Sequence, residues 1–145
     1  LKDYIYEILT SLKNKTKKYE HKIIVDIDKN ISLNSYPGYF YQIITNFINN
    51  SYLHGFENIQ KGEIHIKAIR TNHTIKLIYR DNGIGIKKEN LENIYKEYYT
   101  TKRGKGGTGL GLSIIKNIIT KKLNGEIDIK TEENSGVKFT ITIPI

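Results

Sequence analysis

The chain has 145 residues, about the length of one domain, and 38% of them are hydrophobic and 26% charged. This composition is typical of a globular protein and excludes a disordered tail, and no apolar run reaches the roughly 20 residues that a bilayer-spanning helix needs. The absence of cysteine excludes a disulfide scaffold, a thiolate metal site and a cysteine nucleophile. We expect one domain over residues 1–145, in the cytoplasm. Because the chain begins at Leu1 and contains no Met, we also expect it to be part of a longer protein, for which a membrane anchor stays open.

The formal net charge of +8 raises the question of a nucleic-acid binder. Of the 23 basic residues 20 are Lys, and the chain has 27 Ile and 14 Asn against two Val and one Ala, the usage that A/T-rich codons produce. Because composition explains the surplus of Lys, we expect most lysines to be solvated surface and no specific binding of nucleic acid. The charge remains compatible with an anionic ligand.

The spacing of apolar residues predicts the secondary structure in chain order. The opening stretch has the i, i+3, i+4, i+7 spacing of a helix, and a strand and a second helix follow, over residues 22–28 and from Pro37 to about Gly55. The remaining elements are a hairpin of strands 63–70 and 74–80, a short helix over 88–96, a helix from about 109, and strands 126–130 and 137–143. Because helices and antiparallel-looking strands come in blocks, the order favours an α+β fold, a two-layer sandwich.

Glycine is the most unevenly distributed residue, with seven of the 12 glycines between Gly83 and Gly111. A turn explains one or two of them. Five within eight residues before a helix, over 104–111, fit backbone N–H groups that approach a phosphate, since a helix N-terminus favours an anion. The segment also contains G-x-G-x-x-G, but the residues before it are too polar for the buried strand of a dinucleotide fold. A P-loop motif is absent.

Two further features are ambiguous when each is taken alone. Asn46 and Asn50 lie four residues apart, hence on one helix face, where two amides can hold an oxygen-rich ligand or a hydrated Mg²⁺. In a chain with 14 Asn, a solvated asparagine pair is the alternative. Asp81, followed by Asn and Gly, can likewise bind a ligand or form an ordinary turn.

In this order, the three motifs resemble the ATP-binding domain, or Bergerat fold, that sensor histidine kinases, gyrase, Hsp90 and MutL share. The motifs are Asn46-x-x-x-Asn50 on a helix, Asp81-x-Gly83-x-Gly85 after a strand, and the glycine-rich stretch 107–112 that opens a helix. Residues 43–56 and 100–112 look most like the catalytic domain of a bacterial two-component sensor histidine kinase. The resemblance covers nearly the whole chain and implies a mixed, mostly antiparallel sheet covered on one face by helices.

The resemblance also implies a role for each motif in binding ATP and Mg²⁺. Asp81 would accept a hydrogen bond from the adenine amino group, and Asn50 would supply the protein oxygen to Mg²⁺. Basic side chains and backbone amides would hold the phosphates under a mobile lid over 95–106. The expected ATP-binding residues are Asn46, Asn50, His54, Asp81, Gly83, Gly85, Ile86, Thr101, Lys102, Arg103, Gly107, Thr108, Gly109, Leu110 and Gly111.

Asn46 helps to choose among the relatives. Hydrolysing members of the superfamily typically carry a Glu here that activates water, and an Asn cannot take up a proton. The resemblance therefore favours transfer of the γ-phosphoryl group to a histidine, with Asn46 as the catalytic position. In the family an acidic residue follows the acceptor histidine, and none of His21, His54, His65 and His73 has that context. His54 is expected either to line the adenine pocket or to belong to the helix end.

The acceptor is accordingly expected on an upstream dimerisation domain outside this chain, with a homodimer only in the full-length protein and a response regulator as the next partner. Three features depart from the family pattern: residues 95–98, Tyr-Lys-Glu-Tyr where Phe-x-Pro-Phe is usual, Leu53 in place of a phosphate-reaching Lys or Arg, and the lack of a dimerising helical hairpin. Two alternatives stay open, a stand-alone serine kinase of the anti-sigma-factor type and a degenerate, non-catalytic nucleotide sensor.

Overall fold

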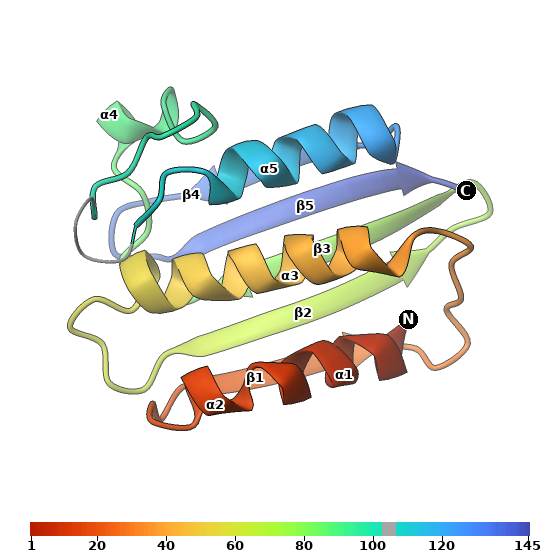
Figure 1. Ribbon diagram of the computed structural model, residues 1–145, viewed down its shortest axis with the longest axis horizontal. Helices are drawn as coiled ribbons and strands as arrows, with labels where there is room; N and C mark the ends of the chain where they lie inside the picture. The colour runs from red at the N-terminus through yellow and green to blue at the C-terminus, as the bar shows by residue number, and fades with distance from the viewer. Residues whose placement is uncertain (103–106) are drawn as a thin grey trace.

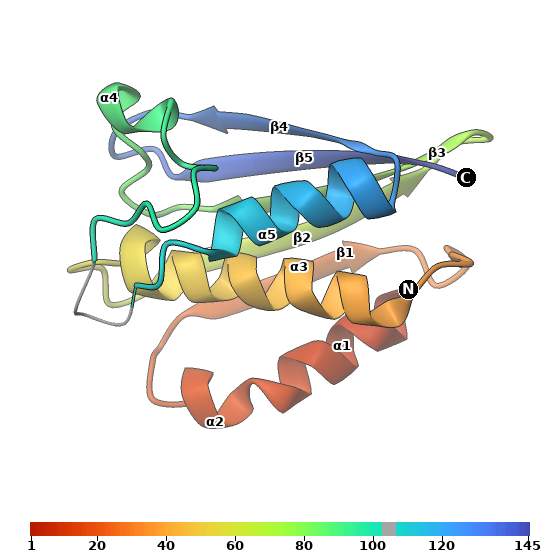
Figure 2. The same cartoon turned by 45° about the horizontal axis from the view of Figure 1, so that its top comes forward.

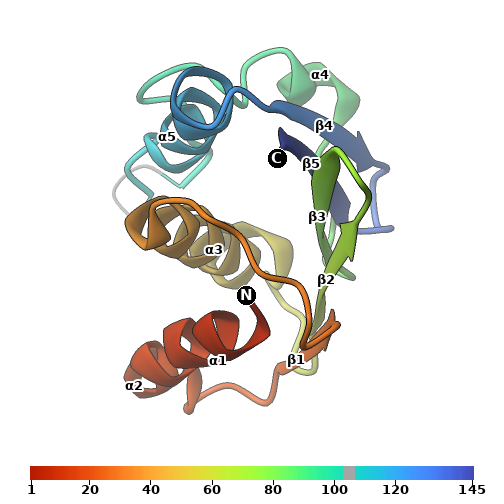
Figure 3. The same ribbon diagram turned by 90° about the vertical axis from the view of Figure 1, so that its right-hand side faces the viewer.

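The computed structural model of the chain describes residues 1–102 and 107–145, in which helices cover one face of a five-stranded sheet and leave the other face open (Figures 1 and 3). The α-helices are α1 (Lys2–Ser11), α2 (Lys13–Thr16), α3 (Pro37–Asn50), α4 (Lys88–Leu91) and α5 (Gly111–Asn117), and the π-helical turns are η1 (Ser51–Gly55) and η2 (Ile118–Lys122). The strands are β1 (Lys22–Ile27), β2 (Glu63–Arg70), β3 (Thr74–Asp81), β4 (Glu126–Thr131) and β5 (Val137–Pro144). The predicted two-layer α+β sandwich is confirmed.

The strands lie in the order β1-β2-β3-β5-β4, and every neighbouring pair is antiparallel except β1 and β2. A parallel pair needs a crossover connection, which α3 supplies between β1 and β2. The central strand β3 is paired along its length with both neighbours, and its last residue, Asp81, lies opposite Ile64 and Val137. This register fixes the place of Asp81 in the molecule.

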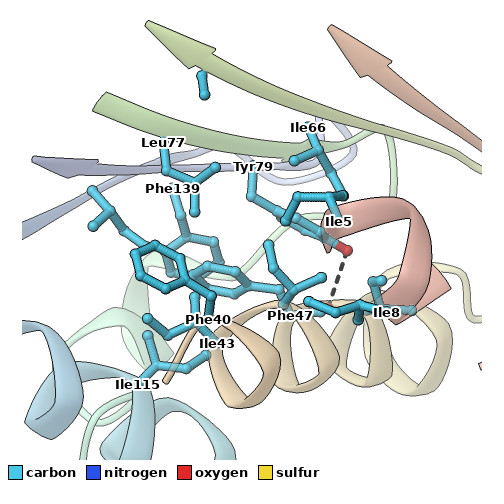
Figure 4. Close-up of a cluster of buried hydrophobic side chains, with 14 of the residues drawn as sticks. Ile5, Ile8, Phe40, Ile43, Phe47, Ile66, Leu77, Tyr79, Ile115 and Phe139 are labelled. Carbon is cyan, nitrogen blue, oxygen red and sulfur yellow. Dashed lines mark hydrogen bonds between the residues drawn. The ribbon is translucent and has the colours of Figure 1, made fainter. Parts of the chain in front are cut away.

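The core lies between the inner face of the sheet and the helices α1, α3 and α5 (Figures 3 and 4). Helix α3 buries the apolar stripe that its sequence predicts, and the ring of Phe47 stacks on those of Tyr79 and Phe139 at centroid distances of 4.9 and 4.5 Å. From α1, Ile5 and Ile8 reach the same core. Each large apolar side chain buried in this way contributes about 1.5–3 kcal/mol to stability.

Two expected helix boundaries are wrong. The helix predicted over 88–96 ends at Leu91, because the following residues form successive i to i−3 turns through Asn90 and Asn93, and asparagine is a weak helix former. The helix predicted from about 109 begins at Gly111, because Gly109 has a φ of 74°, outside the helical region.

Among the described residues, none of the helices is both long enough and apolar enough to cross a membrane.

Candidate functional site

A cavity of about 980 Å³ opens where the end of α3, the loop after β3 and the segment before α5 meet. These three segments lie at the left of Figures 1 and 2. Its volume is at the upper end of the range for small-molecule sites. Most of the residues expected to bind ATP line this one cavity: Asn46, Asn50, His54, Asp81, Gly85, Ile86, Thr101, Gly107, Thr108, Gly109 and Gly111. The fold therefore brings together three motifs that lie far apart in the sequence.

Asp81 is the buried acid of the cavity, with 4% of its surface exposed. Its Oδ2 accepts a hydrogen bond from the Ser51 hydroxyl at 2.6 Å, and its Oδ1 accepts the backbone N–H groups of Gly83 and Val137 at 3.0 and 3.2 Å. A carboxylate has about four acceptor positions, so three donors leave one for a ligand. Asp81 is thus held in place and keeps capacity to accept a hydrogen bond from a molecule in the cavity.

Contacts of Ser51 and Tyr79 connect Asp81 to the core. The Tyr79 hydroxyl lies 2.6 Å from Ser51 Oγ and 3.1 Å from the carbonyl oxygen of Phe47. Burial raises the pKa of Tyr79 well above its ordinary value, so its hydroxyl stays protonated and remains a donor. Figure 4 shows Tyr79 beside Phe47 in this cluster. Ser51 follows α3 directly, at the i+3 and i+4 spacing from Ile48 and Phe47, and a polar residue in line with the apolar stripe is the signal that could have identified it as a partner of Asp81.

The two asparagines on α3 lie next to the start of α5. A Cβ atom on Gly111 would lie 3.6 Å from Asn50 Oδ1 and 3.7 Å from Asn46 Oδ1, so glycine lets the α5 backbone pass close to both amides. Within residues 1–102 and 107–145, neither amide side chain makes a hydrogen bond. Two amides and the first N–H groups of a helix face the same part of the cavity, a combination suited to an oxygen-rich anion and its metal ion.

The glycines after β3 have a packing role. Gly85 adopts a φ of 73°, and a Cβ there would collide with the carbonyl oxygen of Glu132 in the β4–β5 turn. A Cβ on Gly83 would collide with the backbone of Gly55, the last residue of η1. Gly85 lines the cavity, whereas Gly83 lies behind the lining and supports it.

The segment before α5 meets η1 across the cavity. The hydroxyl of Thr101 lies 3.3 Å from Nδ1 of His54, and Lys102 forms an ion pair with Glu57. Lys102 does not line the cavity in this arrangement, so it would have to leave Glu57 to reach a phosphate. Leu110 is also outside the lining, and Arg103 belongs to the residues that the structure does not describe.

His54 lines the cavity and also lies in η1, at the helix end, so its position fits both of the expected interpretations. Burial and the charge of Lys102 lower its pKa, and the neighbouring Glu57 opposes that shift. The imidazole is therefore mostly neutral near pH 7.

The motifs did not assign several cavity-lining residues to ATP binding, among them Asn90, Tyr99 and Thr100. The Tyr99 hydroxyl donates to Asn90 Oδ1 at 2.9 Å, and the Thr100 hydroxyl accepts the N–H of Lys102 at 3.0 Å. The contact of Tyr99 with Asn90 joins residues nine positions apart and depends on the turns that replace the expected helix. The contact of Thr100 with Lys102 is a local turn within the segment expected as a lid.

Residues 36–145 match the family described as histidine kinase-, DNA gyrase B-, and HSP90-like ATPase. The chain belongs to this ATPase family. One relative, the sensor histidine kinase YclK of Bacillus subtilis, is 28% identical over 147 residues, covering 97% of this chain and 30% of YclK. Another, the sensor histidine kinase ZraS of Escherichia coli O157:H7, is 35% identical over 103 residues, covering 70% of this chain and 22% of ZraS. The chain thus spans less than a third of the length of these relatives.

The fold of this ATPase domain is found in solved structures of histidine kinases. The catalytic domain of histidine kinase ThkA has a TM-score of 0.82 and 25% identity, covering 98% of this chain and 92% of that chain. Full-length ShkA, solved in complex with AMPPNP, also has a TM-score of 0.82, but at 17% identity this likeness concerns the fold alone, over 99% of this chain and 29% of ShkA. Because the likeness to ThkA covers 98% of this chain, it extends over most of the first 35 residues, which lie outside the family match.

Proposed function

We propose that this domain binds ATP with Mg²⁺ and donates the γ-phosphoryl group to a histidine on a separate dimerisation domain, as part of two-component signalling. Asp81 carries the proposal, because a buried carboxylate held by three donors keeps one acceptor position for the adenine amino group. The family match and the sensor histidine kinases among the relatives support the same activity.

The residues around the start of α5 suit a triphosphate and its metal. Asn50 would give its amide oxygen to Mg²⁺, and the backbone amides of 107–111, with Lys102 and Arg103, would hold phosphate oxygens. Mg²⁺, when bound, neutralises the charge on the phosphates. Among the described residues no cluster of three His, Cys, Asp or Glu side chains could hold a metal, which fits an ion that takes most ligands from water and phosphate.

The proposed transfer joins an imidazole nitrogen of the acceptor histidine to the γ-phosphorus of ATP. As that bond forms, the bond from the γ-phosphorus to the β,γ-bridging oxygen breaks, and ADP leaves with the electron pair. Asn46 cannot accept a proton, so a water molecule in the cavity lacks a general base there. Transfer to a histidine is therefore favoured over hydrolysis.

The remaining partners belong to the whole protein. We propose that the acceptor lies on an upstream dimerisation domain, that the full-length protein is a homodimer, and that a response regulator receives the phosphoryl group. The domain would act in the cytoplasm, whether or not the full-length protein has a membrane anchor.

Calorimetric titration of the chain with ATP and Mg²⁺ tests the site. Binding should be saturable, and Asp81→Asn should weaken it by about tenfold to a hundredfold, the range for a hydrogen bond to a charged group. Asp3→Asn, at an exposed acid on α1 that does not line the cavity, is the matched control and should bind as the parent does. Circular dichroism verifies that Asp81→Asn is folded. Equal affinity of a folded Asp81→Asn variant and the parent would refute the assignment.

Labelled ATP and a separately expressed acceptor-histidine domain test the transfer. Acid-labile label on that domain is expected. Bound nucleotide without transfer would instead favour the nucleotide sensor, for which Tyr95, Glu97 and Tyr98 in the place of the usual motif are the supporting observation. Label on serine of an acceptor protein would favour the anti-sigma-factor type.

A further inference from the structure

The open face of the sheet carries a row of three cationic side chains that the proposed ATP site does not use. In the strand register, Lys138 of β5 lies directly opposite Arg80 of β3 on one side and Lys130 of β4 on the other. All three residues are exposed, on the face of the sheet that no described helix covers (Figure 3). Neighbouring strands are about 4.8 Å apart, so the row extends across roughly 10 Å of sheet.

This cationic row, Arg80, Lys138 and Lys130, places three cations next to one another in the strand register. Elsewhere on the face Lys67 pairs with Asp26 at 3.0 Å, and His65, which lies opposite Arg80 on β2, pairs with Glu63. Among the described residues, none of the three cations in the row has a carboxylate oxygen within 4 Å. Like charges directly opposite one another destabilise a sheet. An anionic partner bound here would reduce the repulsion among the three cations.

A shallow hollow of about 240 Å³ lies along the row and is closed at one end by the β4–β5 turn. Besides the three cations, its lining contains the hydroxyl residues Thr131 and Ser135 and one carboxylate residue, Glu132. Three cations against one carboxylate give the hollow a net positive charge, and a side chain of a ligand has room to enter it.

We propose that the cationic row is a docking surface for an acidic segment of a partner protein, one that presents two or more Asp or Glu side chains. The cations are exposed, and an exposed ion pair contributes only about 0–1 kcal/mol, so a single small anion would bind weakly. A segment that engages several cations at once adds these small contributions, and it gains on-rate from the positive field. The proposal goes beyond ATP binding and does not depend on it.

Fluorescence anisotropy of a dye-labelled Glu-rich peptide, titrated with the 145-residue chain without nucleotide, tests the docking surface. At low salt the parent should bind, and the double variant Arg80→Gln/Lys138→Gln should bind about tenfold more weakly. The matched control is Lys22→Gln/Lys76→Gln, which removes the same charge from exposed positions on the same face, away from the row. The control should bind nearly as the parent does.

Three results would overturn the proposal. One is the absence of peptide binding by the parent at low salt. Another is an equal loss of peptide affinity in both double variants, which would mean that net charge alone attracts the peptide. The third is tighter binding of a single-stranded oligonucleotide that the row variant, and not the control, abolishes, because the row would then be a nucleic-acid surface. Circular dichroism of both variants verifies that the exposed substitutions leave the fold unchanged.

Discussion

The hydroxyl of Ser51 joins the cavity acid to the buried core, since it lies 2.6 Å from both Asp81 Oδ2 and the Tyr79 hydroxyl. Ser51→Ala leaves the buried carboxylate of Asp81 with one donor fewer. We predict a loss of about 1–3 kcal/mol in the free energy of unfolding, measured by urea denaturation, together with weaker ATP binding. Ser11→Ala is the control, because that hydroxyl donates only to Ile8 within its own helix. A comparable loss in both variants would contradict the special role of Ser51.

A second single-residue prediction concerns His21, whose Nδ1 accepts the backbone N–H of Gly62 at 2.7 Å. Burial lowers the pKa of His21, and protonation would turn its acceptor nitrogen into a donor. Because the folded-state pKa lies below the unfolded value of about 6.5, the neutral form contributes stability that is fully present above pH 6.5 or so. That contribution is lost as the pH falls from there through the folded-state pKa.

Urea midpoints measured from about pH 7.5 to about pH 5 test this dependence. The parent should lose stability over that interval, and His21→Gln should lose less. Part of the slope should remain in the variant, because the pKa of His54 is lowered as well. His73→Gln, in the exposed hairpin turn between β2 and β3, should follow the parent. An unchanged slope in His21→Gln would refute the assignment.

At the scale of elements, the loop after β3 is supported by the turn between β4 and β5. Gly85 has a φ of 73° and no room for a Cβ against Glu132, while a Cβ on Gly38 in α3 would meet nothing within 4 Å. Gly85→Ala should therefore lower the free energy of unfolding by more than about 1–2 kcal/mol and weaken ATP binding. Gly38→Ala should be neutral or stabilising by up to about 1 kcal/mol. Thermal denaturation of the two variants tests this difference in stability. Equal melting temperatures would contradict the prediction.

The elements that sequence predicted well are those with a strong local pattern. The apolar stripe of α3 and the alternation in β3 and β5 follow from burial on one face, and burial is what periodicity reports. The stretch 88–96 failed because its apolar residues are few and its turns depend on contacts with other segments. The cavity followed the same rule: most of the residues that the motifs predicted to bind ATP line it, whereas the pairing of Lys102 with Glu57 joins positions 45 residues apart and has no local signal.

At the scale of the whole molecule, the first 35 residues lie outside the family match and yet complete the core. Ile5 and Ile8 of α1 are 0% and 1% exposed, and β1 is paired with β2 along its full length. The parallel pairing covers what would otherwise be an open edge of β2, and open edges promote association with other chains. Residues 1–35 are therefore expected to fold and unfold together with the remainder.

We predict a single cooperative unfolding transition for the 145-residue chain, with coincident midpoints by far-ultraviolet circular dichroism and by the near-ultraviolet signal of its 11 tyrosines. Ile8→Ala should lower the free energy of unfolding by about 2–5 kcal/mol by both probes, because it leaves a cavity under α3. Tyr6→Ala, at a position on α1 that is 48% exposed, should change it much less. A chain that begins at residue 36 should show no cooperative transition and should self-associate, since it lacks both β1 and the α1 side of the core. Cooperative unfolding of that shorter chain at the parent's midpoint would instead mean that the ATPase core is complete without its first 35 residues.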